Sequence, residues 1–158
     1  MDWTEILEHP SLQDLPFKIE TNAWGQIIMS PASNQHGLYQ AEIAFQLRQR
    51  LPDGIVLTEC SVDTAQGVRV ADVAWLSATF REVHGLETPY RQAPEVCVEI
   101  LSPSNTQAEM DEKILLYLAR GAREVWLCAD DGTLRFYGHQ GQLPASAVAP
   151  DFPAAISP

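Results

Sequence analysis

The sequence has few basic residues. Its 158 residues include 10 Lys and Arg against 21 Asp and Glu, which gives a net charge of −11 at pH 7. Proteins that coat nucleic acids through their phosphates need clustered Lys and Arg. The composition therefore argues against a general nucleic-acid coat protein, although bound cations could neutralise several of the acids.

Long apolar runs and targeting signals are also missing. No run approaches the roughly 20 residues of a membrane span, and the stretch Met1–Glu5 lacks the basic start of a signal peptide. Cys60, Cys97 and Cys128 lie in three different apolar runs without CxxC or Cys/His spacing. They are predicted to be buried free thiols. We therefore expect a cytoplasmic protein that does not contact a membrane.

Several common catalytic motifs are absent. The sequence contains neither GxGxxG nor GxxxxGK[ST], which argues against a nucleotide-binding loop, and no GxSxG elbow. Asp130-Asp131-Gly132 begins like a calcium loop, but the oxygen ligands that should follow are missing. A hairpin turn explains this tripeptide.

The sequence does contain one carboxylate in each of two apolar segments. Asp72 lies within 68–76 and Glu99 within 96–101, and both segments are apolar at nearly every position. Such segments are typical of strands covered on both faces. Because a buried, unpaired carboxylate is costly, each acid should have a partner or bind a cation. On adjacent strands the two carboxylates would lie roughly 4–7 Å apart and could share a divalent ion.

Lys113 follows Glu99 on a predicted helix and could complete this site. Two acids and a lysine suit a metal-dependent phosphodiesterase, in which the ammonium steadies the attacking water or the charge on phosphate. Simpler interpretations remain open for each residue. Asp72 could pair with Arg69, Glu99 could be partly exposed on an edge strand, and Lys113 could form a surface ion pair with Glu109.

The predicted order of elements indicates an α/β (α+β) fold. Thr106 and Glu109 form a capping box that begins the second long helix, and the step from the Glu99 strand to 124–128 is long enough for a parallel crossover. We expect a mixed sheet with a helix on each side. The predicted elements are a hairpin over 17–29, a helix over 36–51, strands at 55–62 and around Asp72, a polar loop over 77–92, the Glu99 strand, a helix over 106–120, and a hairpin over 124–137.

These elements divide the chain into three parts. Residues 1–16 form an N-terminal extension, residues 17–138 form the domain, and residues 139–158 form a tail rich in Ala and Pro. The tail is predicted to be irregular or to pack at an edge.

Several of these segments resemble the Uma-two-type endonuclease family of the PD-(D/E)xK nuclease superfamily. The similarity extends from about residue 17 to 138, and the stretch Glu-x-Leu-Ser-Pro-Ser from Glu99 to Ser104 is quite specific. The segments that carry it are 17–20, 25–31, 36–37, 69–75, 93–105, 109–113, Tyr117, Gly121 and 124–127.

The resemblance implies a restriction-endonuclease-like mixed β-sheet flanked by helices. It also implies that Asp72 and Glu99 bind Mg²⁺ (or Mn²⁺), with Glu20 as a third acid. Leu101 stands where the superfamily usually has its lysine, so the resemblance places that lysine at Lys113. Ala71 is a second departure, since the family usually has proline there.

The resemblance implies supporting residues and partners as well. Glu109 would hold Lys113, while His36 and Tyr117 belong to the matched segments. The expected substrate is nucleic acid, with DNA favoured, and the expected assembly is a homodimer. The alternative is a catalytically inactive binding module that keeps the fold, because a fold alone does not establish activity.

Overall fold

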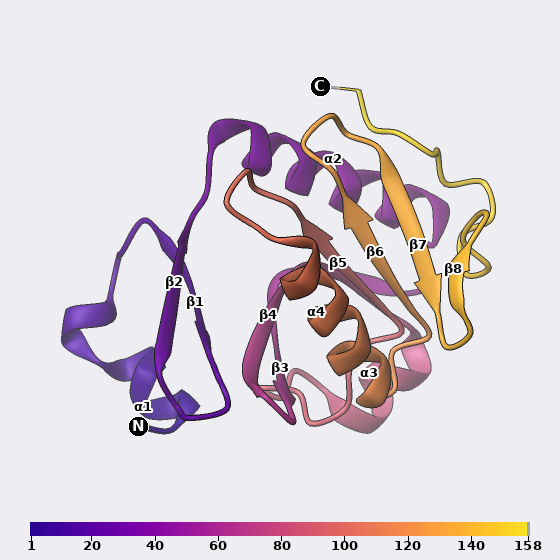
Figure 1. Cartoon of the computed structure of the whole chain (residues 1–158). Helices are drawn as coiled ribbons and strands as arrows, with labels where there is room; N and C mark the ends of the chain where they lie inside the picture. The colour runs from indigo at the N-terminus through magenta and orange to yellow at the C-terminus, as the bar shows by residue number, and fades with distance from the viewer. Residues whose placement is uncertain (158) are drawn as a thin grey trace.

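The computed structural model describes residues 1–157 and contains two β-sheets. The larger sheet has six strands in the order β3-β4-β5-β6-β7-β8, and the smaller one pairs β1 with β2 (Figure 1). The elements are α1 (Trp3–Glu8), η1 (Pro10–Leu12), β1 (Phe17–Thr21), β2 (Ile27–Pro31), α2 (Asn34–Arg50), β3 (Ile55–Thr64), β4 (Gly67–Leu76), α3 (Ala78–His84), β5 (Val96–Ile100), α4 (Gln107–Ala119), β6 (Glu124–Cys128), β7 (Leu134–Gly138) and β8 (Gly141–Leu143).

The large sheet is mixed, as predicted. β5 and β6 are parallel and are joined through α4, which confirms the expected crossover, and the other neighbouring strands are antiparallel. The β4–β5 pairing is short, with Val73, Ala74 and Trp75 opposite Val98, Cys97 and Val96. Beyond these three pairs the two strands separate, and the candidate site lies where they do so.

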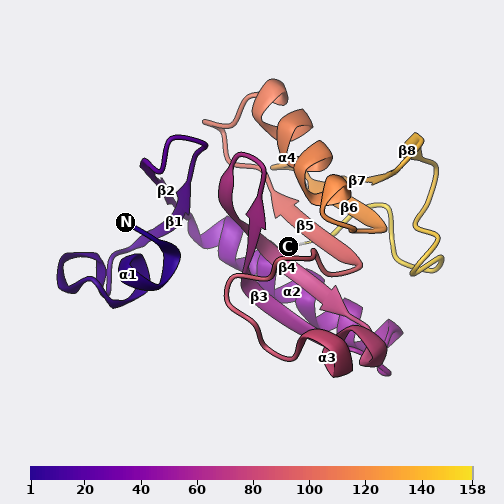
Figure 2. The same cartoon turned by 90° about the horizontal axis from the view of Figure 1, so that it is seen from below.

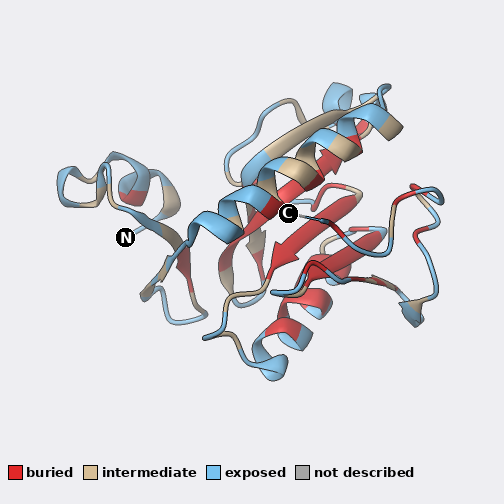
Figure 3. Cartoon of the chain, turned by 90° about the horizontal axis from the view of Figure 1, so that it is seen from above, coloured by how far each residue is buried: buried red, intermediate tan, exposed pale blue. Residues whose placement is uncertain are grey.

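α2 and α4 lie on opposite faces of the large sheet (Figure 2), and the strands between them are largely buried (Figure 3). Each face has its own apolar cluster. On one face, α2 packs Tyr39, Ile43 and Leu47 against residues that include Val98 and Trp126. On the other face, α4 packs Met110, Ile114, Tyr117 and Leu118 against residues that include Cys97 and Leu127. β5 is therefore buried on both sides, as its continuous apolar sequence predicts.

The capping signals of α4 were predicted correctly. The Thr106 hydroxyl accepts a hydrogen bond from the Glu109 N–H at 3.2 Å, and the Glu109 carboxylate accepts one from the Thr106 N–H at 3.0 Å. Gly121 ends the segment with φ +102°, a conformation that favours glycine. This fixed start places Lys113 in the second turn of the helix.

The predicted polar loop over 77–92 is partly wrong, because it contains α3. The Ser77 hydroxyl accepts a hydrogen bond from the Phe80 N–H at 3.0 Å and caps this short helix. Phe80 is buried and packs edge-on against Tyr90, with ring centroids 5.3 Å apart. One aromatic anchor and a cap therefore stabilise a segment whose overall polarity suggested a loop.

The segment after residue 138 packs against the sheet. It contains β8 and buries Ala149, Phe152 and Ile156, and the Phe152 ring lies 4.7 Å from that of Trp126. The three cysteines are free and buried, as expected. None of the described helices is both long and apolar enough to cross a membrane.

The β1–β2 hairpin docks on β4 through side chains. Thr21 Oγ1 and Glu20 Oε2 accept hydrogen bonds from the N–H groups of Val68 and Val70, at 2.8 and 2.7 Å. Gly67 allows this close approach, since a Cβ there would lie 2.5 Å from the Asn22 carbonyl oxygen. The side chains of the small sheet therefore bind the backbone of β4 where β5 does not pair with it (Figure 1).

Candidate active site

The site begins where β4 and β5 diverge. Val73 and Val98 form the last registered pair, and the next residues along the two strands are Asp72 and Glu99. Asp72 Oδ2 accepts a hydrogen bond from the Ile100 N–H at 2.7 Å, so its side chain links the two strands. Both acids are almost fully buried, with 0% and 2% exposure. The sequence prediction that they lie together is consistent with this geometry.

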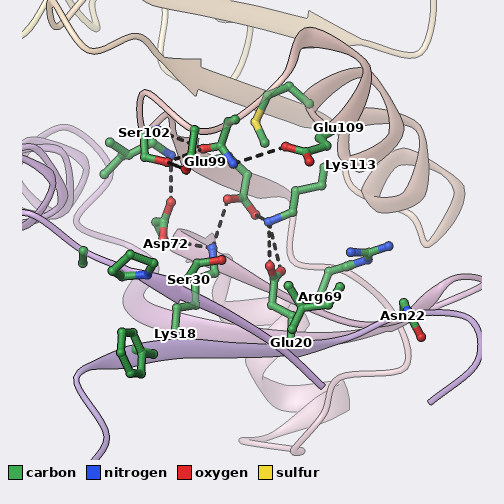
Figure 4. A pocket seen from close by; sticks show the side chains of 18 of the residues that line it. Lys18, Glu20, Asn22, Ser30, Arg69, Asp72, Glu99, Ser102, Glu109 and Lys113 are labelled. Carbon is green, nitrogen blue, oxygen red and sulfur yellow. Dashed lines mark hydrogen bonds and ion pairs between the residues drawn. The ribbon is translucent and has the colours of Figure 1, made fainter. Parts of the chain in front are cut away.

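Lys18 from β1 joins the two acids. Its Nζ lies 3.1 Å from Asp72 Oδ1 and 3.1 Å from Glu99 Oε2 (Figure 4). Asp72 Oδ1 and Glu99 Oε2 can therefore be at most about 6.2 Å apart. This limit lies below the upper end of the separation of roughly 4–7 Å expected for a shared cation. Sequence reasoning missed Lys18. Its signal was the alternation of Lys18 and Glu20, which places both on one face of a predicted strand.

Lys113 makes a second cationic contact on the other side of Glu99. Its Nζ lies 2.9 Å from Glu20 Oε2 and 3.1 Å from Glu99 Oε1. Tyr117, one helical turn later, donates its hydroxyl hydrogen bond to the same Glu99 oxygen at 2.8 Å. The structure therefore brings together Glu20, Glu99, Lys113 and Tyr117, while the contact with Asp72 comes from Lys18 (Figure 4).

The predicted ion pair between Glu109 and Lys113 is wrong. Glu109 turns its carboxylate back to the start of α4, where it caps the Thr106 N–H. The Lys113 side chain instead runs inward and is only 8% exposed. Residues four apart on a helix can pair, but here the buried acids and the capping box give each side chain a different partner.

His36 and Gln40 bring α2 into the site. His36 Nε2 lies 3.4 Å from Asp72 Oδ1. Gln40 Nε2 donates hydrogen bonds to the Asp72 carbonyl oxygen at 2.9 Å and to Glu59 Oε1 at 2.8 Å. His36 thus contacts the predicted acid, and Gln40 fixes the backbone of Asp72.

The lysines lower the pKa values of Asp72 and Glu20, and the acids raise that of Lys18. Burial alone would raise the pKa of Asp72, but Lys18, His36 and the Ile100 N–H hold it below its usual range. Burial likewise opposes ionisation of Glu20, but Lys113 and Lys18 lower its pKa. At Glu99 burial prevails over both lysines, so its pKa is raised. The pKa of Lys18 is raised because Glu99 and Asp72 outweigh the effect of burial.

These groups line a pocket of about 800 Å³. Its walls come from the β1–β2 hairpin, the start of α2, the diverging ends of β4 and β5, and the start of α4. Both lysines and all three acids reach this cavity. The site is therefore open to a ligand from outside, although its charged groups are buried.

The carboxylate oxygens of this site fit a hard divalent cation that has few protein ligands. Asp72 and Glu99 supply carboxylate oxygens, and Mg²⁺ is commonly bound by one or two carboxylates together with water and substrate phosphate. Within residues 1–157, no group of three or more His, Cys, Asp or Glu is placed to hold a metal ion by itself. The residues thus fit an ion that shares its coordination with water and substrate.

The six-stranded mixed sheet with helices on both faces is a restriction-endonuclease-like fold. The profile of the Uma2 family, described as "Putative restriction endonuclease", matches residues 3–156, so the chain belongs to this family. A similar fold occurs in a crystal structure from Anabaena variabilis ATCC 29413, described as a putative nuclease belonging to DUF820. It shares 21% identity with a TM-score of 0.73, and the alignment covers 95% of this chain and 93% of that one. No curated protein matches the chain.

Proposed function

We propose that this protein is a nuclease that hydrolyses phosphodiester bonds of DNA with the help of Mg²⁺ or Mn²⁺. The observation that supports it is the convergence of Asp72 and Glu99 on one cation, the ammonium of Lys18, at 3.1 Å from each. Two buried carboxylates that already share a cation inside an open pocket form a suitable site for a divalent ion. Membership of the Uma2 family supports the same reaction class.

Asp72 and Glu99 would hold the ion, and Lys18 would have to give up at least part of its contact with them. When bound, the ion would polarise the phosphate and lower the pKa of a coordinated water. The Ile100 N–H fixes the Asp72 carboxylate at 2.7 Å, and the Tyr117 hydroxyl fixes that of Glu99 at 2.8 Å. Both ligands are therefore oriented before substrate arrives.

Lys113 would orient the attacking water and stabilise the charge that develops on the phosphate. Glu20 lies 2.9 Å from the Lys113 ammonium and accepts a hydrogen bond from the Val70 N–H at 2.7 Å. We therefore propose that Glu20 acts mainly by positioning Lys113. A preorganised cation of this kind is effective because it needs little rearrangement during the reaction.

The alternative function is that of an inactive binding module. The observation that favours it is that Lys18 and Lys113 already neutralise much of the charge of the acids. A network of buried ion pairs can persist for structural reasons alone. Metal binding and cleavage by the purified protein distinguish the two functions.

The test is cleavage of plasmid and oligonucleotide DNA with Mg²⁺ or Mn²⁺, with RNA as a second substrate. Asp72→Ala and Asp72→Asn should abolish a metal-dependent activity of the wild type. Asp63→Asn, on β3 outside the pocket, is the matched control and should cleave normally. A folded wild type without cleavage, or a fully active Asp72→Asn, contradicts the proposal. Analytical ultracentrifugation tests whether the protein is the expected homodimer. Cleavage of both DNA strands would be further evidence for a dimer.

A further inference from the structure

Trp24 is an exposed aromatic residue at the wall of the pocket. Its side chain is 82% exposed, the highest value among the large apolar residues of the described chain, and it lines the same cavity as Asp72 and Glu99. Exposing an indole costs free energy in water, since burying it would be favourable. The exposed Trp24 indole is therefore suited to bind a flat apolar group of a ligand in the pocket.

The turn that carries Trp24 is well ordered by hydrogen bonds. Asn22 Oδ1 accepts hydrogen bonds from the N–H groups of Trp24 and Gln26, both at 3.0 Å. The Asn22 carbonyl also accepts one from the Gly25 N–H at 3.0 Å. Trp24 follows Glu20 by four residues, so their Cα atoms are no more than roughly 14 Å apart. The indole is thus held within a short reach of the acids.

Arg69 lines the same pocket and has a cationic side chain with unused hydrogen-bonding capacity. It is 9% exposed, its Nε has no hydrogen-bond partner, and its Nη2 lies 3.7 Å from Glu112, whose side chain is 48% exposed. In Figure 4, Arg69 lies beside Glu20, and its guanidinium group extends away from Glu99 and Asp72. A buried guanidinium with a free N–H is suited to a phosphate, which it can contact through two parallel hydrogen bonds.

We propose that Trp24 and Arg69 form a nucleotide subsite next to the acids. Trp24 stacks on an unpaired base of the substrate strand, and Arg69 binds a phosphate of the same strand. This inference rests on the proposed nuclease function and deepens it, because it assigns a substrate class. The substrate presents a single-stranded or locally unpaired segment of DNA beside the bond that is cut.

Stacking accounts for this choice of substrate. The indole needs a free base face, and bases inside an intact duplex have both faces covered by their neighbours. The chain carries a net charge of −11, so it cannot rely on a broad basic surface to hold a duplex. Base–aromatic stacking is tolerant of sequence and complements a small number of phosphate contacts.

The first experiment measures binding of labelled single-stranded and blunt duplex oligonucleotides by fluorescence anisotropy, with Ca²⁺ in place of Mg²⁺. The wild type should prefer the single strand. Trp24→Ala should weaken that binding roughly 10-fold. Trp24→Phe should keep most of the wild-type affinity. Phe45→Ala is the matched control, because Phe45 is an aromatic residue of α2 that is 54% exposed and lies outside the pocket.

The second experiment tests each half of the subsite by a direct signature. Single-stranded DNA should quench tryptophan fluorescence in the wild type, and Trp24→Phe should remove most of that quenching. Arg69→Met should reduce the slope of log affinity against log salt by about one, as expected for the loss of one phosphate contact. Melting temperatures of all variants establish that they are folded.

The outcomes separate the subsite from the nuclease itself. Cleavage by the wild type with unchanged binding by Trp24→Ala would overturn the subsite and leave the nuclease standing. Binding and quenching that depend on Trp24, without any metal-dependent cleavage, would support the subsite and refute the nuclease. Preference for the blunt duplex, or no binding to either oligonucleotide at low salt, would overturn the subsite.

Discussion

Two glutamates lie in the neighbouring strands β5 and β6, and each is only 2% exposed. Glu99 is held by the ammonium groups of Lys18 and Lys113 and by the Tyr117 hydroxyl, at the base of a pocket. Among residues 1–157, the donors to the Glu124 carboxylate are all neutral: the Trp126 indole, the Ser146 hydroxyl and the N–H groups of Ala147 and Val148.

This difference shows that a buried carboxylate can be stabilised either by cations or by neutral donors. The donors around Glu124 belong to the sheet and to the segment 146–148, so this acid ties the C-terminal segment to β6. Neutral donors satisfy its charge, and it does not line the candidate pocket. Glu99 is satisfied by two lysine ammonium groups beside an open cavity, and under the proposed function a metal ion would take the place of Lys18.

The largest expected effect comes from removing the charge of Glu99. Glu99→Gln keeps the shape of the side chain but removes the charge of the proposed metal ligand. Metal-dependent cleavage should fall by roughly 10³-fold or more, as an estimate for the loss of a ligand and of electrostatic stabilisation. Cleavage rates at saturating Mn²⁺ measure this effect.

Glu124→Gln is the matched control for that prediction. It should leave the cleavage rate nearly unchanged but lower the free energy of unfolding by roughly 2 kcal/mol, because the amide cannot accept all the hydrogen bonds that the carboxylate accepts. Urea unfolding measures the loss. Equal loss of cleavage in both variants would mean that Glu99 acts only through stability.

The next effect concerns Lys113. Its replacement distinguishes a catalytic role of the ammonium from a structural one. Lys113→Met keeps the packing of the stem and removes the ammonium. Cleavage should fall by roughly 10²-fold, as for the loss of one electrostatic stabiliser. Single-turnover rates and melting temperatures measure the two contributions. Full activity in a folded Lys113→Met would refute this role, even if Asp72 and Glu99 bind the metal.

Sequence reasoning predicted the part of the site that depends on local pattern. Asp72 and Glu99 interrupt apolar strands, and Lys113 follows a capping box, so each is visible in a short window. Lys18 was missed because its significance depends on where the hairpin docks, and that contact is made by Glu20 and Thr21 across 50 and 47 residues. Alternation in β1 was the available signal, but nothing local showed which face of the hairpin meets β4.

The same distinction holds for the fold. The parallel crossover and most elements between residues 17 and 138 follow from periodicity and connection length, and these were predicted. The burial of Phe152 and Ile156 could not be predicted, because the Ala- and Pro-rich segment has no period and gains its order from Trp126 on the sheet. Tertiary packing decides such segments, and the same applies to α3, which depends on the contact of Phe80 with Tyr90.

A smaller effect, on metal affinity, is expected for Lys18. This residue forms an ion pair with Glu99, whereas Glu124 has neutral donors. Lys18→Met removes a competitor for the oxygens of Asp72 and Glu99, so Mn²⁺ should bind about 10-fold more tightly. The carboxylates would then repel each other more strongly without metal, and the Mn²⁺-induced rise in melting temperature should increase. Isothermal titration calorimetry measures the affinity. Weaker Mn²⁺ binding in Lys18→Met would show that Lys18 helps to organise the site.

The smallest effect is a pH dependence that belongs to the Glu99 region alone. The hydrogen bond to Asp72 raises the pKa of His36 despite its partial burial, whereas the groups that contact Glu124 do not titrate near neutral pH. A raised pKa in the folded state means that protonated His36 stabilises the fold. In metal-free protein this contribution is complete below the unfolded pKa of about 6.5. It is lost as the pH rises through the folded pKa.

His36→Gln should therefore remove a loss of stability on the order of 1 kcal/mol that the wild type shows as the pH rises above about 6.5. Urea unfolding at a series of pH values, without divalent ions, measures it. Glu124→Gln is the control, since it should lower stability by the same amount at every pH in this range. If His36→Gln keeps the pH dependence of the wild type, the hydrogen bond to Asp72 does not control the protonation of His36. The pH response of the wild type would then have to come from a titratable group other than His36.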